Sequence, residues 1–166
     1  MAVRKVLKYP DERLKQEALD VVKLDNHLLQ IIQDLKDTML DAGHSTGIAA
    51  PQISELYKII VIDASINKKC KENHGLTVMI NPEIIEHSGI ISSREGCMSV
   101  PDYTGNVGRA ESIVVSYFDE YMQQQVMSAS GFEAILIQHE TDHLNGILFL
   151  DRVISKRVDL FKRKKY

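Results

Sequence analysis

His139-Glu140-Thr141-Asp142-His143 is the stretch that decides how this chain is organised, because it places two histidines four residues apart in an otherwise apolar segment. If the segment is helical, both imidazoles share one face and can bind one divalent metal ion. Glu140 lies between them and can accept a proton from a water molecule on that metal. Alone, the pattern is only moderately specific, since a helix can also carry two such histidines as solvated surface residues.

A four-coordinate catalytic metal needs a third protein ligand and an open position. Cys97 is the leading candidate for the third ligand. It lies in Glu95-Gly96-Cys97-Met98-Ser99-Val100-Pro101, where Gly96 lets another backbone approach closely and Pro101 ends the run. The alternative is that Cys97 is a buried, inert thiol that packs as a small hydrophobic side chain.

A third unusual segment reads Gly47-Ile48-Ala49-Ala50-Pro51-Gln52. Small residues beside a glycine favour a tight backbone turn that leaves space next to it. Gln52 adds an amide donor and an acceptor. An ordinary helix-to-strand loop is the alternative interpretation.

Together, the three segments resemble the motifs of the peptide deformylase family. That family carries Gly-x-Gly-Leu-Ala-Ala-x-Gln, Glu-Gly-Cys-Leu-Ser and Gln-His-Glu-x-Asp-His in this order. The chain reads Ser45-Thr46-Gly47-Ile48-Ala49-Ala50-Pro51-Gln52, Glu95-Gly96-Cys97-Met98-Ser99 and Gln138-His139-Glu140-Thr141-Asp142-His143, and it opens similarly with Tyr9-Pro10-Asp11-Glu12-Arg13-Leu14. The resemblance covers about residues 6 to 152.

Two residues depart from the family pattern. Met98 replaces a leucine, a nearly volume-conserving change that should be tolerated. Ser45 replaces the first glycine, which could use backbone angles or clearance that serine lacks. Position 45 is therefore where the resemblance is weakest.

The resemblance implies a metal-dependent hydrolase that removes the N-formyl group from the formylmethionine of nascent polypeptides and releases formate. Cys97, His139 and His143 would hold the metal. Glu140 would accept a proton from water and pass it to the leaving amine. The Gln52 side-chain amide and the Met98 backbone N–H would stabilise the charge that develops on the formyl oxygen.

The ligand types leave the metal open. One cysteine and two histidines suit zinc, whereas the resemblance implies Fe²⁺ as the physiological metal. Zn²⁺, Ni²⁺ or Co²⁺ could occupy the site in a purified sample.

The third motif falls on an expected helix of about residues 130 to 144, with Ser128 or Ser130 as its cap and Glu133 completing a capping box. Three apolar residues lie on the same stripe as the histidines and predict a wall for a methionine side chain: Phe132, Ile135 and Leu136. Strand-like edges near Thr46 and Gly96 are expected to pair with the substrate backbone.

The remaining elements predict an α+β fold, in which small antiparallel or mixed sheets pack around this central C-terminal helix. Residues 25 to 42 read as a helix that Asp25 or Asn26 caps and Gly43 ends. Strands are expected at 57–63 and 77–80, with an interruption at Asn81-Pro82 and a strand pair or bend at 84–91. Residues 113–118 and 123–127 read as a hairpin.

Length and composition predict one soluble domain spanning residues 1–166. Hydrophobic residues at 44% and charged residues at 26% are ordinary for a globular protein, and a net charge of −3 gives no reason to expect nucleic acid as the main ligand. No apolar run approaches the roughly 18 residues that span a bilayer, so no membrane partner is expected. The first ten residues lack the apolar core of a secretory signal.

The cysteines point to the cytoplasm. Two of them are too few for a disulfide framework, and a reducing cytosol suits a thiolate ligand. Cys70 lies in a polar stretch and is interpreted as an exposed loop thiol without a role.

Residues 152 to 166 form a basic tail or helix, with seven basic residues against Asp159 alone. Most such tails are solvated and frayed. The alternative is docking on ribosomal RNA, because basic side chains gain phosphate contacts. The oligomeric state is not indicated.

Some residues near the motifs have weaker interpretations. Glu95 and Arg109 either form a pair that fixes the Cys97 segment or are an exposed, unrelated pair. Asp142 should cap or bridge structure rather than orient a ligand histidine, because two residues along a helix it faces elsewhere. His44 is interpreted as solvated, although it lies next to the first motif.

Two other functions remain open at this point. A deformylase-like protein without activity could only bind peptide amino termini, although such a protein has no need of Glu140. A zinc endopeptidase typically takes its third ligand downstream of the helix. After His143 the chain has no histidine and carboxylates only at Asp151 and Asp159, which makes Cys97 the better ligand.

Overall fold

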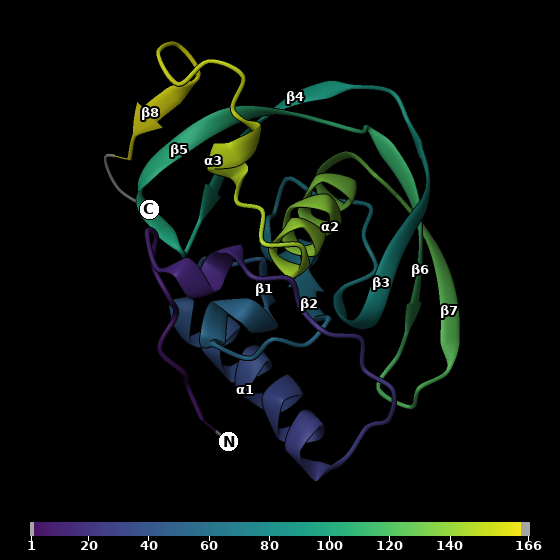
Figure 1. Cartoon of the computed structure of the whole chain (residues 1–166). Helices are drawn as coiled ribbons and strands as arrows, with labels where there is room; N and C mark the ends of the chain where they lie inside the picture. Colours follow the sequence, from purple (N-terminus) through teal and green to yellow (C-terminus); the bar gives the residue numbers. More distant parts are fainter. Residues whose placement is uncertain (1, 164–166) are drawn as a thin grey trace.

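The computed structural model describes residues 2–163, and within them one helix lies between two antiparallel sheets (Figure 1). The helical elements are η1 (Glu12–Lys15), α1 (Asn26–Ala42), η2 (Ala50–Ile53), η3 (Ala64–Ile66), α2 (Gly131–Leu144) and α3 (Phe149–Arg152). The strands are β1 (Gly47–Ala49), β2 (Ile59–Asp63), β3 (Leu76–Ser88), β4 (Ile91–Cys97), β5 (Val100–Arg109), β6 (Ser112–Phe118), β7 (Gln124–Ser130) and β8 (Leu160–Lys162). The expected α+β class is confirmed.

Helix α1 begins and ends at the expected residues. The Asp25 carboxylate accepts a hydrogen bond from the Leu28 backbone N–H at 2.9 Å, and Gly43 adopts the left-handed conformation that closes the helix. Its buried stripe, which includes Leu35 and Met39, packs against β1 and β2. This packing holds one face of the larger sheet.

The five-stranded sheet has the order β1-β2-β3-β6-β7. The almost continuous apolar run of β2 is buried, and β6 alternates between buried and half-buried residues as expected. The β6–β7 hairpin is confirmed, with Phe118 opposite Gln124, and β7 extends to Ser130. Strand β1 forms one edge of this sheet.

The interruption expected at Asn81-Pro82 is wrong, because β3 continues through both residues as a bulge. The register with β6 shifts between Ile80 and Glu83, and Asn81 has a φ of 51°. The Asn81 side chain accepts from the Val21 N–H and donates to the Val21 carbonyl, each at 2.8 Å. Proline is tolerated at a bulge because no ladder hydrogen bond is required of it there.

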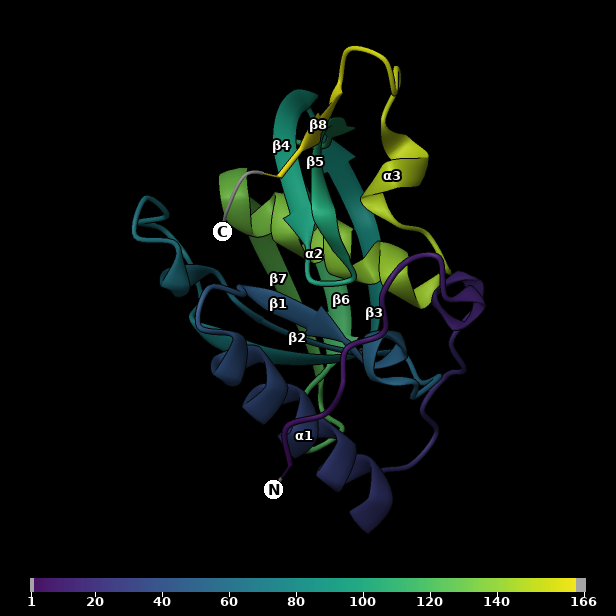
Figure 2. The ribbon, with the colours of Figure 1, turned by 90° about the vertical axis from the view of Figure 1, so that its left-hand side faces the viewer.

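The second sheet has the order β4-β5-β8, so β4 and β8 are its two edge strands. An apolar cluster beneath it includes Val100, Val107, Phe149 and Val153. Figure 2 shows β4, β5 and β8 side by side above the end of the larger sheet.

Helix α2 is the centre of the molecule and is buried on most sides, since it contacts β1, β2, β3, β6 and β7. The expected capping box is wrong. The Ser130 side chain makes no cap hydrogen bond, and Glu133 instead accepts from the His74 backbone N–H at 2.8 Å and lies 2.6 Å from Nδ1 of His74. Glu133 therefore anchors the 67–75 loop to the start of α2.

The C-terminal segment contains no helix between Val153 and Arg163. Leu160–Lys162 forms β8 instead, paired with β5, and residues 164–166 of the basic segment lie outside the described residues. Within residues 2–163, no helix combines the length and the apolar character that a membrane span requires.

Candidate metal centre and substrate pocket

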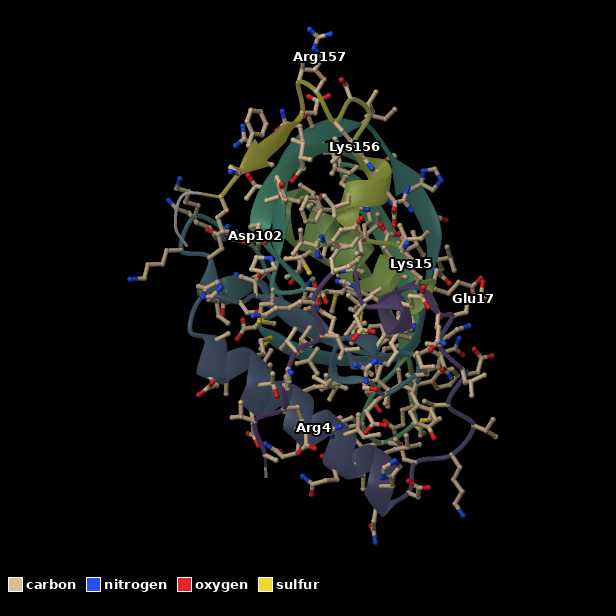
Figure 3. The ribbon with its side chains drawn as sticks, turned by 60° about the vertical axis from the view of Figure 1, so that its left-hand side comes forward. Arg4, Lys15, Glu17, Asp102, Lys156 and Arg157 are labelled. Atoms are coloured by element: carbon tan, nitrogen blue, oxygen red, sulfur yellow. The ribbon has the colours of Figure 1, made fainter. Side chains whose placement is uncertain are left out.

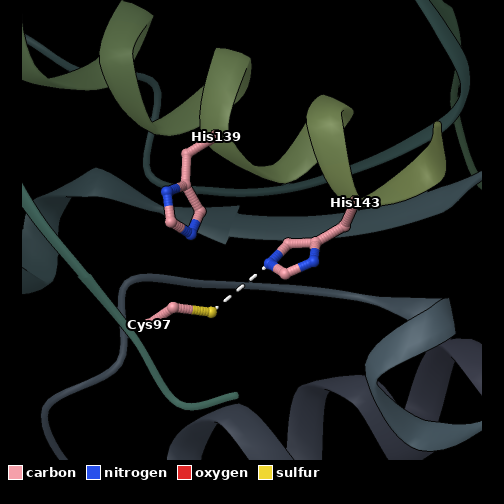
Figure 4. A group of neighbouring side chains, drawn as sticks. All are labelled: Cys97, His139 and His143. Carbon is pink, nitrogen blue, oxygen red and sulfur yellow. Dashed lines mark hydrogen bonds between the residues drawn. The ribbon is translucent and has the colours of Figure 1, made fainter. Parts of the chain in front are cut away.

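Three side chains from two elements converge on one point (Figure 4). Cys97 ends β4, whereas His139 and His143 lie one turn apart on α2. One ligand atom from each lies within 4.8 Å of the others, and Cys97 Sγ is 3.3 Å from Nε2 of His143. All three side chains are buried. The two motifs therefore form one group of soft and borderline donors, as expected.

The charges around Cys97 favour its thiolate. Burial alone would raise the pKa of the thiol, but the charge of His143 and hydrogen bonds from His139 and His143 lower this pKa well below its usual range. A thiolate is the form that binds a metal.

Glu95 and Arg109 are paired and buried, which resolves the choice between a supporting pair and an exposed one. Arg109 donates to both Glu95 carboxylate oxygens, at 2.7 and 2.8 Å. Glu95 also lies 2.8 Å from Nδ1 of His139. Burial would raise the Glu95 pKa, but the hydrogen bonds from Arg109 and His139 lower it to about 2.

Asp142 bridges structure, as expected, and does not contact a ligand histidine. It accepts from Arg109 at 2.6 Å and from Arg152 at 2.5 and 2.8 Å. Arg109 thus links Asp142 to Glu95, and a chain of alternating charges runs from Arg152 to His139.

Glu140 lies beside the ligands, with Oε1 3.8 Å from Nε2 of His139. Burial raises the pKa of Glu140 to about 7, against the opposing charges of His139 and His143. Its Oε2 atom is buried without a hydrogen-bond partner among residues 2–163. A carboxylate with a free, buried oxygen and a pKa near neutrality is suited to accept and return a proton.

Gly47 provides the space for Glu140. A Cβ atom at position 47 would lie 2.8 Å from Leu136 Cδ1 and 3.0 Å from Glu140 Cγ. Ser45, two residues earlier, needs no unusual conformation, since it is absent from the positive-φ residues. Its hydroxyl donates to the Gly47 carbonyl at 2.9 Å, so serine is compatible with this turn.

Gln52 lies next to Cys97. Its Oε1 accepts from the Ala49 N–H at 2.9 Å, and its Nε2 lies 3.4 Å from Cys97 Sγ and 3.0 Å from the Ser99 hydroxyl. Ser99 is fully buried, and the motif spacing alone did not reveal this contact.

A pocket of about 270 Å³ opens beside Cys97, His139 and Glu140. It is lined by every residue expected to bind substrate, and by Met98: Thr46, Gly47, Gly96, Met98, Phe132, Ile135 and Leu136. Gln52 and His143 do not line this pocket. His44 does line it, and its side chain is exposed, as expected. A larger hollow of about 940 Å³, lined partly by Arg109 and Gln138, includes none of the three ligand residues.

Cys70 differs from its expected state, because it is half-buried rather than exposed. It packs against the core, and its thiol donates to the Glu72 carbonyl at 3.4 Å. Burial raises its pKa, so Cys70 is a poor metal ligand compared with Cys97.

An α+β fold with a Cys–His–His group, an adjacent carboxylate and an apolar pocket defines a class of metal-dependent hydrolase. Residues 3–159 match the family model described as polypeptide deformylase. The chain belongs to this enzyme family, whose known function is the deformylation of N-formylmethionine.

Known peptide deformylases are similar to this chain over nearly its whole length. The peptide deformylase of Thermodesulfovibrio yellowstonii is 38% identical over 99% of this chain and 97% of its own. A crystal structure of a peptide deformylase from Legionella pneumophila has a TM-score of 0.84 at 41% identity, covering 92% of this chain and 86% of that chain. A Met-Ala-Ser-bound class I type b peptide deformylase from Acinetobacter baumannii has a TM-score of 0.84 at 36% identity, covering 92% and 99%.

Proposed function

We propose that this chain removes the formyl group from N-formylmethionyl peptides in the pocket beside Cys97, and that Cys97, His139 and His143 hold one divalent metal ion. The observation that carries the proposal is the convergence of these three donors next to Glu140, beside a pocket that Cys97, His139 and Glu140 line and that has an apolar wall.

The donor set fits such an ion. One thiolate and two imidazoles leave an open position in a tetrahedral site. Glu140 is adjacent, and its Oε2 has no hydrogen-bond partner among residues 2–163. When bound, the ion lowers the pKa of a water molecule and polarises the formyl carbonyl. We propose Fe²⁺ as the physiological ion, with Zn²⁺, Ni²⁺ or Co²⁺ as substitutes in purified protein.

Glu140 moves the proton in this proposal. Its pKa of about 7 lets it accept a proton from the attacking water and return it to the leaving amine. Gly47 leaves the space that the Glu140 side chain occupies, because any side chain at position 47 would collide with it.

Gln52 and Met98 supply hydrogen-bond donors for the formyl oxygen. The Gln52 carboxamide is held by Ala49, and its Nε2 points to the Cys97 sulfur. A substrate oxygen next to the sulfur could accept from this Nε2 and from the Met98 backbone N–H.

The substrate backbone pairs with β1 and β4, and its methionine side chain lies against Phe132, Ile135 and Leu136. Both strands are free sheet edges, and Thr46 to Gly47 and Gly96 line the same pocket. The Acinetobacter baumannii relative was crystallised with Met-Ala-Ser bound, which supports a product of this kind at the corresponding place.

We place the enzyme in the cytoplasm, acting as a single domain on emerging chains. Docking of the basic residues 152–166 on ribosomal RNA is part of this proposal, since Lys156 and Arg157 are exposed, and Figure 3 shows Arg157 projecting from the molecule.

Formate release from formyl-Met-Ala-Ser tests the function directly. An enzyme should release formate, lose this activity with a chelator and regain it with Fe²⁺ or another divalent metal. A protein that only binds peptides would show affinity without formate, and an endopeptidase would release an internal fragment. Either result would contradict the proposal.

A further inference from the structure

Ser99 is a fully buried serine in the short turn that joins β4 to β5. Strand β4 ends at Cys97, β5 begins at Val100, and these two residues are paired, so Met98 and Ser99 alone form the turn. Residues that connect two strands usually lie on the surface, whereas Ser99 is 0% exposed. A buried hydroxyl requires a hydrogen-bond partner inside the protein. The partner of Ser99 therefore indicates why a polar side chain is buried here.

That partner is the side chain of Gln52. Nε2 of Gln52 donates to the Ser99 hydroxyl oxygen at 3.0 Å, and the same nitrogen lies 3.4 Å from Cys97 Sγ. An amide nitrogen carries two hydrogens. One hydrogen is therefore taken by Ser99, and the other points to the sulfur, next to which the formyl oxygen is proposed to lie.

The rest of the structure fixes how Gln52 faces Ser99. Oε1 of Gln52 accepts from the Ala49 N–H at 2.9 Å, so a flipped amide would set two donors against each other. The Leu7 N–H donates to the Gln52 carbonyl at 2.7 Å, and the Tyr9 N–H donates to the Ser99 carbonyl at 2.8 Å. One N-terminal segment thus holds the backbones of both residues, and the fold sets the distance between their side chains.

We propose that Ser99 is a positioning residue for Gln52: its hydroxyl occupies one hydrogen of Nε2 and so directs the other hydrogen toward the formyl oxygen of the substrate. The inference rests on the proposed function. Without the hydroxyl, one hydrogen of Nε2 would be buried and unpaired, and the carboxamide would tilt toward another acceptor. The tilt would move the second hydrogen away from the place where negative charge develops, and a misplaced donor stabilises that charge less.

The variant Ser99→Ala tests this role, because it removes the hydroxyl and almost no volume. The kcat for formyl-Met-Ala-Ser should fall about 10- to 100-fold, less than the roughly 10²- to 10³-fold that loss of a whole oxyanion donor costs. Metal content should not change. Ser116→Ala is the matched control and should keep the wild-type kcat. Ser116 also accepts a hydrogen bond from a glutamine side chain, that of Gln124 at 3.2 Å, but it lies on β6 and does not line the pocket.

The affinity for product distinguishes the positioning of a donor from a general change in the pocket. Met-Ala-Ser has no formyl oxygen, so its inhibition constant should agree within about twofold between wild type and Ser99→Ala, since an interaction made only in the transition state affects kcat. A loss of product affinity as large as the loss in kcat would mean that Ser99 only supports the pocket. That result would overturn the inference.

A double-mutant cycle tests whether Ser99 acts through Gln52. Gln52→Leu removes the amide, and adding Ser99→Ala to it should lower kcat no further, because the group that Ser99 positions is already absent. Two residues that act independently would instead give effects that multiply. Multiplying effects would also overturn the inference.

The outcomes separate this inference from the function on which it rests. A wild-type kcat in Ser99→Ala, with formate still released, would overturn the inference alone. Absence of formate from wild-type protein loaded with Fe²⁺ would overturn the proposed function.

Discussion

Glu95 accepts a hydrogen bond from Nδ1 of His139 at 2.8 Å, and this contact sets the tautomer of a candidate metal ligand. An ionised carboxylate can only accept, so Nδ1 carries a proton and donates it to Glu95, which leaves Nε2 as the nitrogen that a metal ion can use. Arg109 keeps Glu95 ionised through two hydrogen bonds. A buried arginine thus determines which nitrogen of His139 is available beside Cys97.

The low pKa of Glu95 predicts a pH-dependent contribution to stability. The pKa falls from 4.5 to about 2 on folding, so the contribution is complete above pH 4.5 and is lost as pH falls toward 2. In chelator-treated protein, Glu95→Gln should lower the free energy of unfolding by about 3 kcal/mol at pH 7 and by roughly half of this at pH 3. Urea unfolding of both proteins at pH 7 and pH 3 measures this. If the difference in the free energy of unfolding between wild type and Glu95→Gln were the same at both pH values, the ionisation of Glu95 would not contribute to stability.

Glu140→Ala should retain fold and metal and lose activity, because Glu140 transfers a proton and binds no metal. A decrease of about 10²- to 10⁴-fold in kcat is expected for a general acid–base group. Formate release and metal content are measured on the same preparation. The exposed Glu111 provides the control variant Glu111→Ala, which should match the wild type. More than about a tenth of the wild-type rate in Glu140→Ala would assign the proton transfer to another group.

Cys97→Ser should lose metal affinity and activity together, since a hydroxyl is a poor anionic ligand at neutral pH. Cys70→Ser should change neither, because Cys70 contacts the core and the Glu72 carbonyl rather than the histidines. Metal analysis after dialysis decides between them. Equal metal loss from the two variants would show that Cys97 is not the ligand.

Gly47→Ala should reduce kcat while leaving metal content unchanged. The new methyl group would lie 2.8 Å from Leu136 and 3.0 Å from the Glu140 side chain, so the carboxylate must move. A displacement of this kind can cost about 10²-fold in rate. Gly108→Ala is the control, since no described atom lies within 4 Å of a Cβ there. Full activity in Gly47→Ala would mean that Glu140 tolerates the shift.

The apolar wall predicts the preference for methionine. Replacing formyl-Met by formyl-Ala should lower kcat/KM by at least about tenfold, because each lost methylene is worth about 1–3 kcal/mol in such a pocket. Ile135→Asp should abolish the preference and leave metal binding largely intact, since Ile135 lines the pocket without contributing a ligand atom. Equal rates on both peptides with native protein would contradict this pocket assignment only.

The parts of the fold with a regular apolar pattern could be predicted from the sequence. The stripe of α1, the buried run of β2 and the alternation of β6 each match an element of the structure. Strands β4 and β5 carry no such pattern, since Ile91–Cys97 is largely polar and Val100–Arg109 contains Pro101, Gly105 and Gly108. Backbone pairing with neighbours and the cluster around Phe149 hold these strands, and local sequence does not encode either.

In the candidate site, too, local features could be predicted from the sequence and long-range contacts could not. Residues within the three motifs could be selected because their chemistry and spacing are local, as with His139 and His143. Contacts made across the fold could not be derived, as with Ser99 beneath Gln52 and Arg163 over Gly96. The Glu133 capping box failed for the same reason, because the 67–75 loop supplies a better partner in His74.

Strands β1 and β4 each end a sheet, and both border the same pocket. A peptide paired with both would become a temporary strand that joins the two sheets into one hydrogen-bonded layer. Main-chain amides and carbonyls are the same in every polypeptide, so contacts of this kind cannot tell one protein from another. An enzyme that binds its substrate at such a seam can process unrelated chains that share only their first residue.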